Sequence, residues 1–276
     1  MNKKTPFTVA CVQINSSNNM ASNLNRANEL VSQAAEQGAQ LILLPENVAL
    51  MAGHSRELHM QAVEMERHKA IVALSKLAKT HNIWLVVGSI AVPAAHSGKM
   101  YNRCVVISPD GMIVNHYDKI HLYDVVLPDG DTYSEPKNFD PGKKLVMQDL
   151  PWGTLGLSIC YDLRFPHMFR ALAKRGSDFL SIPAAFVQLT GAAHWHVLLR
   201  ARAIETGCYV FAPAQVGSHP GDRKTYGHSL IIDPWGEVIA DAGGIEEGII
   251  MANIDPVKVG YNRKVMPSLS HDRPFE

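Results

Sequence analysis

The sequence lacks long apolar runs and clusters of positive charge. No stretch of its 276 residues comes near the roughly 20 consecutive apolar residues that a membrane-spanning helix needs. Basic and acidic residues both number 26, so the formal net charge is zero. Without a basic run there is no electropositive face to bind nucleic acid or an anionic membrane in general. We therefore expect neither nucleic acid nor membrane as a partner.

Cysteine is also scarce. The chain has four cysteines, none in a CxxC pair, which argues against a disulfide framework. The first residues, Met1–Thr8, include two lysines but no long apolar stretch follows them, so they are not typical of a secretory signal peptide. We expect free thiols and, by default, a cytoplasmic protein.

Short apolar, β-branched runs alternate with helical patterns along almost the whole chain, which predicts an α/β protein. The runs predict strands at residues 8–14, 41–44, 83–90, 154–159, 179–182, 208–213 and 248–254. Apolar residues at helical spacing predict helices at about 27–37, 64–80, 166–175 and 192–206, the first one stopped by Gly38. No linker or low-complexity segment divides the chain, so we expect one domain over residues 1–276.

Two segments resemble each other and predict hairpins. Residues 102–119 and 227–240 each carry a four-residue turn, Ser-Pro-Asp-Gly and Asp-Pro-Trp-Gly, between apolar runs. Pro in second place and Gly in fourth are typical of a type I turn. The hairpins indicate mixed sheets and a weak internal duplication. The loop at 124–143 is long enough to indicate a functional role, and the tail Met266–Glu276 has no periodic pattern, so we expect it along a surface or a partner subunit.

Cys160 differs from the other cysteines in its surroundings. It ends the apolar run 155–159, and Pro166 behind it suits the first position of a helix. We therefore expect the thiol on a turn between strand and helix, where unpaired N–H groups lower its pKa from about 8.5. The alternative is a small core hydrophobe, which is our interpretation of the three cysteines inside apolar strands, Cys11, Cys104 and Cys208.

A thiol nucleophile needs a base, and the thirteen histidines offer no clear one. His194 and His196 lie two residues apart in a predicted helix, so they point to different faces and suit neither one catalytic site nor a zinc pair. His116 and His121, on either side of Lys119, stay open as candidate bases.

Glu46 and Lys119 are more informative. Glu46 follows Pro45 and four apolar residues, so a carboxylate stands at the end of a buried strand, where it needs partners or a task. Lys119 ends the second strand of the first predicted hairpin. Each could be a solvated loop residue, but an acid, a lysine and a thiol each at the end of a predicted core strand favour one catalytic set.

Several motifs occur together in one order along nearly the whole chain. They are residues 43–46 (LLPE), 117–122 (YDKIHL), 159–166 (ICYDLRFP), 191–205 (GAAHWHVLLRARAIE), 226–229 (YGHS) and 233–236 (DPWG). In this order and at this spacing they resemble the nitrilase, or carbon–nitrogen hydrolase, superfamily.

This resemblance implies an α-β-β-α sandwich of mixed sheets and a catalytic triad of Glu46, Lys119 and Cys160. It implies a second, structural glutamate in the loop after the lysine, a place that Glu135 matches. Family members usually pair through the helices beside the cysteine, so a homodimer is expected. No metal or organic cofactor is implied.

The expected reaction is hydrolysis of a small linear amide to a carboxylic acid and ammonia through a cysteine thioester. Lys119 and the backbone N–H of Tyr161 would stabilise the oxyanion. Arg164 is the nearest clamp for a substrate carboxylate, although an ion pair with Asp162 or another acid is an equal alternative.

Within the superfamily, residues 198–210 and 226–229 look most like the deaminated glutathione amidases. His167 and His196 stand where glutamate is commoner in this branch, which leaves the pocket electrostatics and the dimer contact open. The alternatives are a 2-oxoglutaramate ω-amidase or an N-carbamoyl hydrolase of the same superfamily, a non-catalytic binding or scaffold protein, and, more distantly, a Cys–His thiol protease.

Overall fold

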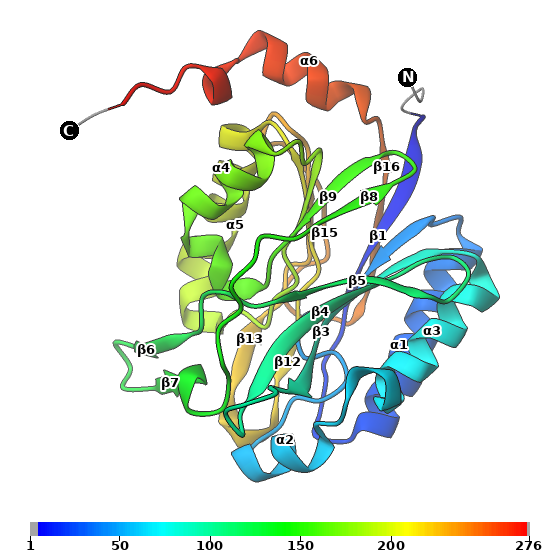
Figure 1. The fold of residues 1–276 in the computed structure, drawn as a ribbon, viewed down its shortest axis with the longest axis vertical. Helices are drawn as coiled ribbons and strands as arrows, with labels where there is room; N and C mark the ends of the chain where they lie inside the picture. The colour runs from blue at the N-terminus through cyan, green and yellow to red at the C-terminus, as the bar shows by residue number, and fades with distance from the viewer. Residues whose placement is uncertain (1–4, 275–276) are drawn as a thin grey trace.

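The computed structural model describes residues 5–274 and consists of two six-stranded sheets stacked between helices (Figure 1). The first sheet has the order β16 (Gly248–Ile254), β1 (Phe7–Gln13), β2 (Leu41–Leu43), β3 (Trp84–Pro93), β4 (Met100–Ile107), β5 (Ile113–Asp118). The second has the order β15 (Val238–Asp241), β14 (Leu230–Ile232), β11 (Tyr209–Ala212), β10 (Phe179–Ser181), β9 (Gly153–Leu157), β8 (Met147–Leu150).

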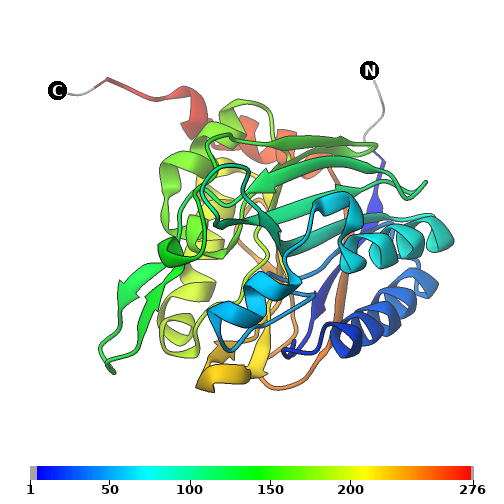
Figure 2. The same ribbon diagram turned by 60° about the horizontal axis from the view of Figure 1, so that its bottom comes forward.

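Two helices cover the outer face of each sheet. Helices α1 (Met20–Glu36) and α3 (Lys69–His81) lie on the first sheet, and α4 (Pro166–Lys174) and α5 (Gln188–Thr206) lie on the second (Figures 1 and 2). This is the expected α-β-β-α sandwich with mixed sheets.

The two halves of the chain repeat one strand pattern. In the first sheet, β1, β2 and β3 pair in parallel, and β16, β4 and β5 add antiparallel strands at the two sides. The second sheet has the same arrangement, with β9, β10 and β11 parallel and β8, β14 and β15 antiparallel. Both predicted turns close by the expected hydrogen bond, from Gly111 N–H to Ser108 O and from Gly236 N–H to Asp233 O, each 2.9 Å. The repeat agrees with the predicted internal duplication.

The core occupies both faces of the first sheet, which explains why its strands are continuous apolar runs. In β1, Val9 and Cys11 point into the space between the sheets, whereas Ala10 and Val12 pack against α1 and α3. All three cysteines that we interpreted as core residues are fully buried, namely Cys11, Cys104 and Cys208.

The sequence pattern missed several elements. These are α2 (Ser55–Gln61), β6 (Asp124–Val126), β7 (Thr132–Ser134), β8, β12 (Val216–Ser218), β13 (Lys224–Tyr226), α6 (Val257–Val265) and several 3₁₀ turns. The strands among them have only three or four residues, too short a run to show a period, and the two helices bury at most one side chain each, so they have no apolar face. The helix predicted from residue 64 begins only at Lys69, where the His68 side chain accepts the N–H of Ala70 at 3.2 Å.

The described part of the tail lies along α4, where Arg170 and Lys174 both pair with Asp272. Residues 275–276 of the predicted tail and 1–4 of the N-terminal segment lie outside the described residues. Over residues 5–274, no helix has both the length and the apolar character needed to cross a membrane.

Candidate active site

Glu46 stands on a tight turn directly after β2 and Leu44-Pro45. The next residue, Asn47, has a left-handed backbone (φ 58°) and donates its N–H to Ser89 Oγ at 2.9 Å. The turn also presses on β3 at Gly88, where a Cβ atom would come within 2.0 Å of Leu44 O. Only glycine fits at such an approach, so this part of the sequence fixes where the carboxylate points.

The Glu46 carboxylate is buried, with 1% of the residue exposed, and is held by three donors. Oε1 accepts from Asn102 Nδ2 and Lys119 Nζ, and Oε2 accepts from Ala185 N–H, each at 2.9 Å. Burial raises the pKa of Glu46, but Lys119, Arg223 and the Ala185 N–H lower it by more, so it lies below its ordinary value. Glu46 is therefore an ionised carboxylate at neutral pH.

Lys119 follows β5 and reaches two carboxylates from a fully buried position. Its Nζ lies 2.9 Å from Glu46 Oε1 and 2.9 Å from Glu135 Oε1, and only 1% of its side chain is exposed. Burial lowers the pKa of Lys119, but Glu135 and Glu46 outweigh it and raise the pKa above its ordinary value. The ammonium has three protons, so one remains beyond these two bonds.

Glu135 begins the turn after a hairpin that was predicted only as a long loop. Strands β6 and β7 form that hairpin, which projects from the body of the molecule (Figures 1 and 2). Besides Lys119, Glu135 accepts the N–H of Tyr123 on Oε2 at 2.7 Å. The loop thus brings a second carboxylate to the lysine, at the place the sequence indicated.

Cys160 lies three residues after the end of β9, on a 3₁₀ turn, Cys160–Arg164, that precedes α4. Its backbone is left-handed (φ 47°), which is unusual for a non-glycine residue. The turn is fixed by Cys160 N–H donating to Pro183 O and by Ile159 N–H donating to Asp162 Oδ2, both at 2.9 Å.

The expected lowering of the Cys160 pKa is wrong. Burial raises the pKa of the thiol well above its ordinary value, and the Glu46 carboxylate, through its charge and a hydrogen bond, raises it further, although Lys119 and Arg223 lower it. The thiol is 8% exposed and is separated from the start of α4 by the 3₁₀ turn. It therefore rests as a protonated thiol beside an ionised carboxylate, not as a free thiolate.

No histidine contacts the thiol in the part of the chain that the structure describes. His121 is bound to Asp162 Oδ1 through Nδ1 at 2.7 Å and stacks on the Phe165 ring at 3.6 Å. Neither His121 nor His116 lines the pocket in which Cys160 lies. Glu46 is the basic group that the thiol faces.

One pocket of about 350 Å³ brings together all six side chains that the sequence singled out. They are Glu46, Lys119, Glu135, Cys160, Tyr161 and Arg164. The backbone N–H of Tyr161 donates to no acceptor among residues 5–274, as befits the first turn of a helix.

Arg164 is not the ion-pair partner of Asp162, which was one of the two alternatives. Asp162 is buried and bound by Tyr117, His121 and Ile159. Arg164 forms no ion pair with an acid among the described residues, and instead lies 5.2 Å from the Phe186 ring and 3.3 Å from His194 Nδ1. Its guanidinium remains available to the pocket.

Two further pocket or site residues escaped the sequence reasoning. Arg223 lines the pocket, donates Nη2 to Ala185 O at 2.7 Å and lies 5.6 Å from the Tyr133 ring. Nothing in its polar turn sequence distinguishes it. Asn102, which donates to Glu46, left only a weak signal, because it is an amide next to Arg103 near the start of a strand whose second half is apolar.

The family follows from this geometry and from comparison with known proteins. The carbon–nitrogen hydrolase family model matches residues 8–264, so the chain belongs to the carbon–nitrogen hydrolase family. A deaminated glutathione amidase of Synechocystis is 43% identical over 96% of this chain and 98% of its own length. The omega-amidase NIT2 of Homo sapiens is 36% identical over 98% of this chain and 96% of its own.

A solved structure shares the fold closely. The NitFhit protein of C. elegans superposes with a TM-score of 0.90 at 35% identity, and the match covers 97% of this chain. This chain spans only 65% of the length of that protein. The relatives named above are amidases, and an amidase of this family is the enzyme that the comparisons support.

Proposed function

We propose that this chain hydrolyses a linear amide through a thioester on Cys160. The observation that carries the proposal is the buried arrangement of Glu46, Lys119 and Glu135 beside the Cys160 thiol in one pocket. A carboxylate, an ammonium and a thiol so placed supply a base, an oxyanion donor and a nucleophile.

Acylation begins when Glu46 takes the thiol proton as Sγ attacks the amide carbonyl carbon. The carbonyl oxygen becomes an oxyanion, which the free proton of Lys119 and the N–H of Tyr161 stabilise. The raised pKa of the thiol and the lowered pKa of Glu46 make proton transfer unfavourable before substrate arrives. Transfer is therefore coupled to formation of the carbon–sulfur bond.

The intermediate collapses as the carbon–nitrogen bond breaks and Glu46 returns its proton to the leaving amine. The product is a thioester on Cys160. Glu46 next takes a proton from water as the water oxygen attacks the thioester carbonyl carbon. The carbon–sulfur bond then breaks, Glu46 returns the proton to Sγ, and the acid leaves. Glu135 holds Lys119 in place and balances its charge throughout.

Deaminated glutathione is the substrate we favour. The most similar relative reported above carries that name, and the compound ends in a keto acid with a carboxylate. The charged residues that line the pocket are two carboxylates, Glu46 and Glu135, and three cations, Lys119, Arg164 and Arg223. Three cations against two carboxylates leave the pocket net positive, which favours an anionic substrate. Arg164 and Arg223 are the two guanidinium groups able to bind a carboxylate.

The leaving amine depends on the substrate. In deaminated glutathione the amide nitrogen belongs to a cysteine residue, so hydrolysis releases cysteinylglycine. From the sequence we expected ammonia as the product, and that expectation is wrong for deaminated glutathione. Ammonia is the leaving group only from a primary amide such as 2-oxoglutaramate. The acid is 2-oxoglutarate in both cases. The NIT2 likeness makes the ω-amidase reaction the second candidate.

We also infer a homodimer formed through α5. Three exposed apolar side chains lie on one face of this helix, Leu189, Val197 and Ile204, with 46, 67 and 52% exposure. Trp235, 59% exposed, extends the apolar surface beside Ile204. Sedimentation of the wild type against Val197→Glu tests this interface.

We also propose a cytoplasmic location, because all four cysteines are free and free thiols are typical of reducing compartments. The two sheets share one core, which supports a single domain over residues 1–276.

The test is release of 2-oxoglutarate from deaminated glutathione and from 2-oxoglutaramate, measured side by side. Cys160→Ala is the key variant and Cys208→Ala, a buried cysteine outside the pocket, is its control. We expect turnover with kcat/KM higher for deaminated glutathione, abolished in Cys160→Ala and kept in Cys208→Ala.

A higher kcat/KM for 2-oxoglutaramate would replace the substrate and leave the mechanism standing. Full activity of Cys160→Ala would overturn the mechanism. No product from either amide, nor from carbamoyl compounds, together with no labelling of Cys160 by a thiol-reactive amide analogue, would favour a binding or scaffold protein.

A further inference from the structure

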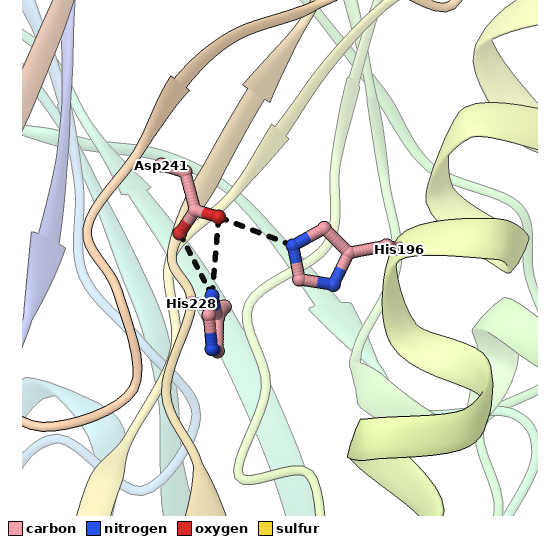
Figure 3. Close-up of side chains that lie close together, drawn as sticks. All are labelled: His196, His228 and Asp241. Atoms are coloured by element: carbon pink, nitrogen blue, oxygen red, sulfur yellow. Dashed lines mark hydrogen bonds and ion pairs between the residues drawn. The ribbon is translucent and has the colours of Figure 1, made fainter.

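Three side chains from separate elements converge at the edge of the second sheet, away from the pocket. His196 comes from α5, His228 from the segment before β14, and Asp241 from the end of β15 (Figure 3). His196 Nε2 lies 3.2 Å from Asp241 Oδ2, and His228 Nδ1 lies 3.0 and 3.1 Å from Oδ1 and Oδ2. One ligand atom of each residue lies within 4.8 Å of the other two.

The backbone around these residues holds them in place. His228 has a left-handed backbone (φ 53°), and its carbonyl accepts the Trp195 indole N–H at 2.8 Å. Asp241 Oδ1 accepts the N–H of Gly243 at 2.8 Å. A left-handed histidine is a strained conformation that the fold must support, and here it aims Nδ1 at the carboxylate.

Two of the three ligand–ligand distances are close to those around one metal ion, and the third, between the two imidazole nitrogens, is at most 4.8 Å. With metal–ligand bonds of about 2.0–2.2 Å at tetrahedral angles, neighbouring ligand atoms lie about 3.3 Å apart. The measured nitrogen–oxygen separations of 3.0–3.2 Å are within a few tenths of an ångström of that value. Two imidazoles and one carboxylate are a donor set that zinc accepts.

We propose that His196, His228 and Asp241 form a binding site for a divalent transition-metal ion of the zinc type, with the fourth position open to water. The three side chains are 32, 24 and 34% exposed, so an ion can enter from solvent. His194, two residues before His196 on α5, is not part of this cluster and lies 3.3 Å from Arg164 Nη1. The partners of His196 come from other elements.

Binding exchanges the hydrogen bonds to Asp241 for metal bonds. A carboxylate only accepts hydrogen bonds, so the nitrogen of each histidine that faces Asp241 carries a proton in the metal-free site. That nitrogen must give up its proton to bind the ion, and the other ring nitrogen then carries the N–H. The ion then links α5 to the β14–β15 hairpin.

The test is zinc binding by the full-length, chelator-treated protein, measured by competition with a chromogenic zinc indicator. Cys160 is a rival ligand, because thiolates bind zinc well, so Cys160→Ala is measured alongside. We expect one zinc per chain in the wild type and in Cys160→Ala. His196→Gln and Asp241→Asn should each weaken binding by at least about 10-fold, and His81→Gln, a histidine on α3, should not.

A fold check keeps the result interpretable. The melting temperature of each protein is measured with zinc and with chelator, because only a bound ion raises it. A zinc-dependent rise in the wild type that is absent from folded His196→Gln supports the site. Equal zinc affinity in the wild type and the two cluster variants, or loss of binding in Cys160→Ala alone, overturns it.

Discussion

Two carboxylates in this molecule, Glu46 and Asp241, each accept several hydrogen bonds. Glu46 is buried, whereas Asp241 is accessible to solvent. Glu46 is 1% exposed and is bound by a lysine, an amide and a backbone N–H. The Asp241 side chain is 34% exposed and is bound by two histidines and a backbone N–H. In the buried centre around Glu46 every hydrogen-bond partner is fixed, whereas at the edge of the second sheet around Asp241 water can replace any hydrogen-bond partner.

The internal repeat makes this comparison direct. Lys119 follows β5 and Asp241 ends β15, and these two strands occupy matching places in the two sheets. The same framework therefore presents an ammonium in the buried pocket and a carboxylate at an accessible edge. We expect changes in the buried centre to have large effects on both activity and stability, and changes at the edge to have small ones.

The largest effect is expected from Glu46→Gln. Glutamine keeps the shape and the hydrogen bond to Asn102 or Ala185 but does not accept the thiol proton. General-base catalysis contributes about 10²–10⁴-fold, so kcat should fall at least about 100-fold. Steady-state hydrolysis of deaminated glutathione measures it, with the exposed Glu36→Gln as control. A kcat within threefold of the wild type would remove Glu46 from the role of base.

Lys119→Met should be the most destabilising single change in the centre. It leaves the carboxylates of Glu46 and Glu135 without the ammonium between them. Removing one partner of a buried ion pair lowers the free energy of unfolding by about 3–5 kcal/mol. Urea unfolding of the variant against Lys76→Met, an exposed lysine on α3, measures the loss. Equal free energies of unfolding for the two variants would mean that the buried ion pairs of Lys119 do not stabilise the fold.

The pH dependence of stability sharpens the same point. The folded pKa of Glu46 is lowered, so its contribution is present above the unfolded value of about 4.3 and is lost as pH falls through the folded pKa. The folded pKa of Lys119 is raised, so its contribution is present below about 10.4 and is lost as pH rises through the folded pKa.

The stability difference between the wild type and Glu46→Gln should therefore be constant between about pH 5 and 9 and fall below about pH 4. Urea unfolding at a series of pH values checks this. A difference that already changes between pH 6 and 8 would contradict an ionised Glu46 in the folded protein.

The sequence predicted the main side chains of the buried centre because each of them follows a predicted strand. Glu46 and Cys160 each come shortly after an apolar run, β2 and β9, and Lys119 directly follows β5, the second strand of the predicted hairpin. A polar residue directly after an apolar run leaves a visible break in the pattern. Asn102 left a weaker signal, because it is a buried amide next to Arg103 in a strand whose second half is apolar.

The features that failed to show in the sequence depend on contacts between distant segments. Arg223 enters the pocket from a polar turn that looks like any solvated turn. The sign of the Cys160 pKa shift depends on burial by the opposite sheet and on Glu46, which lies 114 positions away in the printed sequence. The partners of His196 are 32 and 45 positions away, so its neighbours in the helix say nothing of them.

The smallest effect is expected from Asp241→Asn in the presence of chelator. Asparagine keeps an oxygen that can accept from one histidine, and the side chain is about one-third exposed, so water can satisfy the other. Interactions of such exposed charges contribute about 0–1 kcal/mol, and the free energy of unfolding should fall by no more than that. Urea unfolding of Asp241→Asn and of Lys119→Met, each against the wild type, measures the smallest and the largest expected loss of stability. A loss above about 3 kcal/mol at Asp241 would show that the edge cluster is as fixed as the buried centre, and the contrast drawn from burial would fail.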